Sequence, residues 1–183
     1  REKSFNTLAI ELNIPKLNRI ECYDISNLLG KYAYGSMVVA VDGSLDRSKY
    51  RIFKIKGEES PDDYRMLREV LMRRFKGDEP MPELLLIDGG KGQVSTVMNC
   101  IPESITLMGI SKGRRFKRKG SRKHDEFWIV RNGEIYSIRL DNPEILIDLR
   151  DEAHRFAIRH YRKRSIKESK RSVLDSIDGV GEK

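Results

Sequence analysis

The chain has 183 residues and a formal net charge of +8, with 35% charged and 38% hydrophobic residues. This length is enough for one domain with a hydrophobic core, or for one domain with a small appendage. No apolar run reaches the roughly 18 residues of a membrane-spanning helix, and the N-terminus lacks a secretory signal pattern, so we expect no membrane partner. With only two cysteines, a disulfide framework is not expected, and we expect a cytoplasmic protein.

The positive charge is concentrated in two segments. Residues 112–123 contain eight Lys or Arg and no acid, and residues 155–171 contain eight with a single Glu. A solubilising surface is the alternative, but clustering of this kind favours a polyanionic partner, of which nucleic acid is the commonest. The side chains that we expect to contact DNA in these segments are Arg114, Arg115, Lys117, Arg155, Arg159 and Arg162.

The first third of the chain predicts a helix end followed by three strands. Residues 1–13 read as a helix that Asn13 and Pro15 end. Three strand-like runs follow, joined by short loops: residues 19–25, 32–41 and 49–56. Short loops between consecutive strands predict an antiparallel meander.

The middle of the chain alternates helices and strands. Ser60 and Pro61 are typical of a helix start, and Gly77 and Pro80 of its end. A wholly apolar strand, a helix and a second buried strand are then predicted in order: residues 84–88, 93–100 and 105–110. Strand–helix–strand units require parallel pairing with a right-handed crossover.

The last third predicts a hairpin and a long helix. Asn132 and Gly133, between alternating strands in residues 126–140, are a strong hairpin signal. A helix is predicted from Pro143 to about residue 167. Three antiparallel strands continued by parallel units predict an α/β fold with a mixed five-stranded sheet flanked by helices, which resembles the ribonuclease H-like architecture. Nucleases of that architecture have a carboxylate in the first strand, another ending the fourth, and a further ligand on the last helix.

Asp24 and Asp88 occupy the first two of these positions. Asp24 lies inside a strand, on the face of Ile20 and Cys22, where an ionised carboxylate is costly unless it is paired or binds a metal. Asp88 ends an apolar strand and precedes two glycines, and ligands collect at the carboxyl ends of strands in open sheets. The alternatives are that Asp24 caps a turn and that Asp88 forms an Asp-Gly turn.

His154 occupies the third position, on the predicted last helix. Helical spacing places it beside the apolar stripe, facing the sheet edge rather than open water. A neutral imidazole there can bind a metal or accept a proton from water, although a structural histidine is the alternative. Asp63 begins the helix after the third strand, where it is a candidate site residue or a capping-box partner of Ser60. Lys91 is a candidate phosphate contact.

Two aspartates and a histidine suit the hydrolysis of a phosphodiester bond. Mg²⁺ or Mn²⁺ held by two carboxylates neutralises the scissile phosphate and activates a water molecule. Two protein ligands leave coordination positions open for a phosphate oxygen and for that water. The sequence has no Cys/His zinc spacing and no signature of a nucleophilic Ser or Cys.

Five motifs resemble the C-terminal half of the UvrC excinuclease subunit of bacterial nucleotide excision repair. They are residues 19–26 (RIECYDIS), 36–42 (SMVVAVD), 60–64 (SPDDY), 84–93 (LLLIDGGKGQ) and 150–157 (RDEAHRFA). The resemblance implies a ribonuclease H-like endonuclease domain that makes the 5′ incision beside a DNA lesion. It implies Asp24, Asp88 and His154 as catalytic residues and Asp63 as a further one. The aspartates would be direct metal ligands, with His154 acting on the metal or through its water.

The resemblance also sets the expected domains and partners. Residues 1–171 are the predicted endonuclease domain, and residues 172–183 the linker and truncated start of a helix-hairpin-helix domain. Because the chain begins without a methionine, we expect a fragment of a longer protein. We expect it to be monomeric, since no extra heptad or exposed apolar stripe suggests a dimer. The resemblance implies that the full-length protein acts on a UvrB–DNA complex. Residues 112–123 are longer and more basic than the family predicts at that loop.

Two other functions remain open on the residues alone. One is a nuclease-fold module that binds DNA or docks proteins without turnover, although such a module has no need for converging metal ligands. The other is an RNA-cleaving ribonuclease H, because these residues do not by themselves distinguish a DNA strand from an RNA strand.

Overall fold

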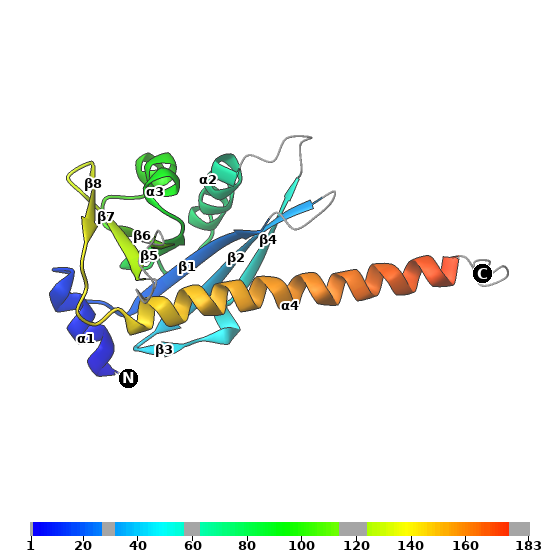
Figure 1. Cartoon of the computed structure of the whole chain (residues 1–183), viewed down its shortest axis with the longest axis horizontal. Coiled ribbons are helices and arrows are strands. Elements are labelled where there is room, and N and C mark those ends of the chain that lie inside the picture. The colour runs from blue at the N-terminus through cyan, green and yellow to red at the C-terminus, as the bar shows by residue number, and fades with distance from the viewer. Residues whose placement is uncertain (1, 27–31, 57–62, 114–123, 176–183) are drawn as a thin grey trace, which may run out of the picture.

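The computed structural model describes residues 2–26, 32–56, 63–113 and 124–175 (Figure 1). Eight strands in these ranges form one mixed sheet in the order β3-β2-β1-β5-β6-β7-β8, with β4 also paired to β2. The strands are β1 (Arg19–Ser26), β2 (Tyr32–Val41), β3 (Ser44–Leu45), β4 (Arg51–Lys56), β5 (Leu84–Asp88), β6 (Thr106–Lys112), β7 (Asp125–Arg131) and β8 (Glu134–Ile138). The helices are α1 (Glu2–Glu11), α2 (Asp63–Phe75), α3 (Lys91–Val97) and α4 (Glu144–Asp175), with short turns η1 (Arg47–Lys49) and η2 (Met98–Cys100).

The five predicted strands are present with the predicted directions. β2 pairs antiparallel with β1 and β4, whereas β5 runs parallel to β1 and β6. The prediction of five strands in the sheet is corrected to eight in the described residues. The short strand β3 pairs with β2, and the hairpin β7–β8 joins the same sheet. The hairpin pairs with the open edge of β6, where Phe127 and Ile129 enter the core.

Helices cover both faces of the sheet (Figure 1). One core lies between the sheet and the helices α1 and α4, and includes Leu8, Leu146, Cys22 and Leu86. The other lies beneath α2 and α3. Each strand supplies alternate residues to the two cores, as the period of two in a strand requires.

The helix α4 is longer than its apolar pattern predicts. It ends at Asp175, whereas the buried stripe ends at Ala157, and its C-terminal part projects past the sheet (Figure 1). Among the described residues, no helix is both long and apolar enough to cross a membrane. The predicted helix-hairpin-helix start in residues 176–183 and the basic residues 114–123 lie outside the described residues.

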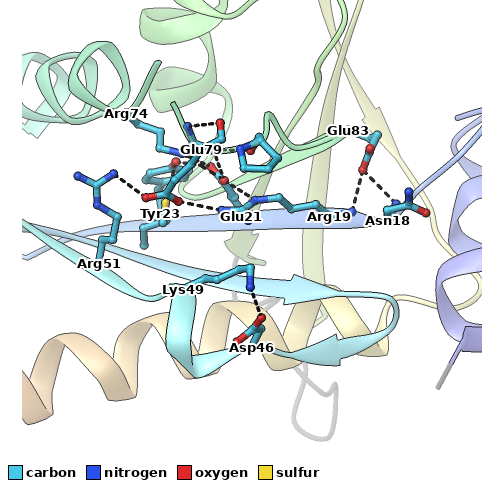
Figure 2. A network of polar contacts seen from close by, with 12 residues as sticks. Asn18, Arg19, Glu21, Tyr23, Asp46, Lys49, Arg51, Arg74, Glu79 and Glu83 are labelled. Carbon is cyan, nitrogen blue, oxygen red and sulfur yellow. Dashed lines mark hydrogen bonds and ion pairs between the residues drawn. The ribbon is translucent and has the colours of Figure 1, made fainter. Parts of the chain in front are cut away.

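A buried network of charges fixes β1 to the end of α2 (Figure 2). Glu21 and Arg74 are both 0% exposed, and the Arg74 Nη2 donates to Glu21 Oε1 at 2.7 Å. Arg19 and the Tyr23 hydroxyl also donate to the Glu21 carboxylate, at 2.8 and 2.6 Å. Arg74 Nη2 also donates to the carbonyl of Pro80 at 2.6 Å, which holds the turn before β5 against β1.

Breaking this network should unfold the chain more easily. We expect Arg74→Met to lower the free energy of unfolding by about 3 kcal/mol, because it leaves the Glu21 charge buried without its main partner. The measurement is urea unfolding followed by circular dichroism. Arg68→Met, at an exposed position on the same helix, should change the free energy by less than about 0.5 kcal/mol. Equal losses in both variants would contradict a stabilising role for the buried pair.

Candidate active site

Asp24 and Asp88 lie side by side near the carboxyl ends of two adjacent parallel strands, β1 and β5. In the parallel pairing of β1 and β5, Cys22 is opposite Leu86, and the two aspartates lie two residues further on each strand. Because alternate residues share a face, both carboxylates belong to the face that α4 covers. The two aspartates therefore lie at the carboxyl ends of the parallel strands, which is where ligands of open sheets bind.

The two carboxylates influence each other electrostatically. Burial, and next the negative charge of Asp24, raise the pKa of Asp88 from 3.8 to about 6, while Arg150, His154 and Lys112 act in the opposite direction. Asp24 is itself only 8% exposed. Two acids in a partly buried place therefore concentrate negative charge, which a bound cation would relieve.

His154 projects from α4 toward Asp24. Its Nδ1 lies 3.7 Å from Asp24 Oδ2, which is beyond a hydrogen bond. The imidazole reaches the sheet edge, as the helical spacing predicts, but 65% of its side chain is exposed, so solvent and substrate can approach it. The distance and the exposure suit a group that exchanges protons with water at the site.

Asp63 and Lys91 begin the two helices of the opposite layer. Asp63 is the first residue of α2 and Lys91 the first of α3. Because β4 runs in the same direction as β1, β4 ends on the side of the sheet where β1 carries Asp24. The helix α2 follows β4 in the sequence. A Cβ on Gly92 would lie 3.1 Å from the Tyr64 hydroxyl, so the two helix starts are close together.

Arg150 is a site residue that sequence reasoning missed. It lies on α4 one helical turn before His154, and its guanidinium is held by Asp125 and Asp151. Its positive charge lowers the pKa of Asp88. The spacing of four residues from His154, which places both on one helix face, was the available signal.

Ser36 is a second missed residue, and it connects the three elements of the site. It lies opposite Asp24 in the pairing of β1 and β2 and is 1% exposed. Its hydroxyl lies 3.4 Å from the carbonyl oxygens of both Asp24 and Ala153. Ser36 therefore joins the strand of Asp24 to the helix residue that precedes His154.

The turn after Asp88 packs closely on β6. Gly89 donates its N–H to the carbonyl of Ile110 at 2.9 Å. A Cβ added to Gly109 would lie 2.6 Å from the Gly89 carbonyl oxygen and 2.5 Å from a methyl group of Val94. Only glycine at 109 allows this approach, which holds the end of β5 in place.

The carboxylate oxygens of Asp24 and Asp88, at these strand ends, fit a hard divalent cation. Among the described side chains, no group of three or more His, Cys, Asp or Glu is close enough to form a complete metal site. Mg²⁺ does not need one, because it commonly binds one or two carboxylates and completes its shell with water and phosphate oxygens. Asp24 and Asp88, whose charges lie close enough for Asp24 to raise the pKa of Asp88, meet that requirement.

Comparison with known proteins identifies close sequence relatives. The family described as the UvrC RNAse H endonuclease domain matches residues 9–158. UvrABC system protein C of Geobacter sp. strain M21 is 40% identical over 202 residues, which cover 100% of this chain and 31% of that protein. UvrABC system protein C of Thermotoga petrophila is 42% identical over 165 residues, which cover 89% of this chain and 28% of that protein. The chain thus spans about a third of the length of the curated relatives it matches.

A solved structure gives a more distant similarity. The catalytic domain of human endonuclease V is 18% identical, with a TM-score of 0.40 over 54% of this chain and 46% of its own. The sequence relatives, and not this remote likeness, establish the family.

The raised pKa of Asp88, caused first by burial and next by the charge of Asp24, predicts a pH-dependent gain in stability for Asp88→Asn. Because folded Asp88 has a pKa of about 6 instead of 3.8, the folded chain keeps a proton that the unfolded chain has lost. The contribution of this retained proton to the free energy of unfolding is fully present below about pH 4 and is lost as the pH rises through about 6. Asparagine does not titrate, so the Tm advantage of the variant should grow across this range in thermal melts with a chelator.

The matched control is Asp148→Asn, at an exposed position of α4. This variant should show no comparable growth with pH. A constant Tm difference between Asp88→Asn and the wild type from about pH 4 to 7 would mean that folding does not raise the pKa of Asp88.

Proposed function

The chain belongs to the family of the UvrC RNase H endonuclease domain, and we propose that it cuts one strand of DNA by hydrolysing a phosphodiester bond. The observation that carries this proposal is the pair of strand-end carboxylates, Asp24 and Asp88, with His154 above them on α4. In the longer protein, the proposed reaction is the 5′ incision beside a lesion, made on a UvrB–DNA complex in the cytoplasm.

Asp24 and Asp88 are the proposed ligands of Mg²⁺ or Mn²⁺. When bound, such an ion neutralises the scissile phosphate and makes water a better nucleophile. The two carboxylates come from adjacent strands of a rigid sheet, which fixes the spacing of their oxygens before any substrate arrives. Burial of Asp24 limits the water that competes for its carboxylate.

His154 and Arg150 are the proposed partners of the carboxylates from α4. His154, as neutral imidazole, would accept a proton from the attacking water, which its exposed ring can reach. Arg150, held by Asp125 and Asp151, would keep positive charge beside Asp88 and the phosphate. Asp63, the first residue of α2, is a further proposed site residue, and its helix begins close to the start of α3.

The proposed DNA contacts are exposed basic residues around the candidate active site. In the described part of the chain they are Lys91, Arg155, Arg159 and Arg162, all of which are exposed. Arg155 follows His154 directly, so a strand whose phosphate reaches the site would also reach this helix. Contacts of this kind make binding strongly dependent on salt.

We expect Asp24→Asn and Asp88→Asn each to lower strand cutting more than about a hundredfold, because asparagine keeps the shape of the side chain and removes the charge that holds the cation. The measurement is nicking of a supercoiled plasmid with Mg²⁺ or Mn²⁺. Uptake of Mn²⁺, followed by calorimetry without DNA, should be lost in the same variants.

Asp148→Asn is again the control, and it should cut and bind Mn²⁺ like the wild type. Wild-type cutting rates in Asp24→Asn would refute the assignment of that residue. A wild-type chain that takes up no Mn²⁺ and makes no nicks would favour the binding module without turnover.

We expect His154→Ala to lower the rate of cutting by about 10²–10⁴-fold, because the attacking water loses its proton acceptor. The exposed imidazole contributes little packing, so the Tm should change by less than about 2 °C. His160→Ala is the comparison, because His160 packs against the Tyr34 ring at 5.2 Å. That variant should lose stability and keep cutting. A His154 variant that melts earlier yet cuts normally would make this histidine structural.

A further inference from the structure

A hollow of about 500 Å³ lies between η1 and α4. We call it the arginine hollow, and its lining residues are Arg47, Glu152, Arg155, Ile158, Arg159 and Arg162. Arg47 comes from the turn η1, whereas the other five belong to α4. Arg155, which lines the hollow, is the residue after His154 in the sequence.

Glu152 is the buried centre of the arginine hollow. Its side chain is 3% exposed, and it accepts hydrogen bonds from Arg155 Nε at 3.1 Å and Arg159 Nη2 at 3.2 Å. Arg47 Nε lies 3.6 Å from the same carboxylate. One buried acid therefore orients three guanidinium groups from two segments that are far apart in the sequence.

The charges of the arginine hollow do not balance. Its lining contains four arginines and one glutamate, a surplus of three positive charges. The side chains of Arg47, Arg155 and Arg159 are 71%, 61% and 53% exposed, so their outer N–H groups face solvent. An ion-pair cluster that served stability alone would not need this surplus, which repels itself and suits an incoming anion.

Two aromatic rings pack together one helical turn beyond Glu152. The Tyr50 ring packs edge-on against Phe156 with ring centroids 5.2 Å apart. Burial, and next the charge of Glu152, raise the pKa of Tyr50 to about 12. Glu152 is buried and accepts hydrogen bonds from Arg155 and Arg159, so the arginines that it orients have less side-chain entropy to lose on binding.

We propose that the arginine hollow is a subsite for a backbone phosphate of DNA, separate from the scissile phosphate, with Arg47 as a contact and Glu152 as a positioning residue. The proposal rests on the proposed function, because it takes DNA as the substrate. The planar fork of a guanidinium matches phosphate oxygens, and several forks held in one orientation bind a phosphate better than mobile lysines do. A phosphate held here would keep the strand aligned with His154.

The first test compares Arg47→Gln with Lys49→Gln, because both changes remove one positive charge from η1. Lys49 pairs with Asp46 at 2.7 Å and does not line the arginine hollow. Fluorescence anisotropy with a labelled DNA duplex, in chelator so that nothing is cut, gives the affinity at several salt concentrations. Arg47→Gln should reduce the slope of log K against log salt by about 0.9, and Lys49→Gln should leave it unchanged. Equal effects in the two variants would overturn the subsite.

The second test removes the centre of the hollow with Glu152→Gln. This variant adds one net positive charge, so diffuse attraction predicts tighter DNA binding. The proposal predicts weaker binding at about 0.15 M salt, because arginines without the carboxylate repel one another and lose their common orientation. Tighter binding, in a variant whose circular dichroism matches the wild type, would overturn the role of Glu152.

A third arm distinguishes DNA from an acidic protein partner. A poly-glutamate peptide competes with the labelled duplex for the wild type and for Arg47→Gln. We expect it to compete weakly and equally in both, whereas a peptide that binds as tightly as DNA and depends on Arg47 would overturn a nucleic-acid subsite. All three arms measure binding without cutting, so a chain that fails to nick DNA can still support or refute this subsite.

Discussion

The parallel alignment of β1 with β5 is the constraint on which the candidate site depends. Glu83, which precedes β5, accepts the main-chain N–H groups of Asn18 and Arg19 at 3.0 and 2.7 Å (Figure 2). Glu21, further along β1, is bound by Arg74 from the end of α2. Since a slip of one residue moves every side chain of a strand to the other face, these contacts support the register that places Asp24 beside Asp88.

The two faces of β1 use negative charge in opposite ways. Glu21 is fully buried and is neutralised by Arg19 and Arg74, so its charge stabilises the packing of α2. Asp24, three residues later, faces α4 and adds to the charge of Asp88 instead. The buried ion pairs of Glu21 support the fold, whereas two neighbouring acids, one of which raises the pKa of the other, suit the binding of a cation.

Local patterns predicted the order of elements and the positions of Asp24, Asp88 and His154, because strand alternation and helical spacing depend on neighbouring residues. They did not predict that β7 and β8 extend the sheet, since this depends on which edge of β6 is open. The apolar stripe also ends before α4 does, so the length of the helix was underestimated. Arg47 meets Glu152 across more than a hundred residues, and a contact of this range has no local signal.

The projection of α4 has a mechanical consequence. A helix of 32 residues is about 48 Å long, and contacts of Arg164 with Tyr34 are the last described ones that attach it to the sheet. Beyond them the C-terminal part of the helix projects past the sheet (Figure 1). Because His154 and the projecting part belong to one helix, a force on that part would be transmitted along α4 towards the imidazole.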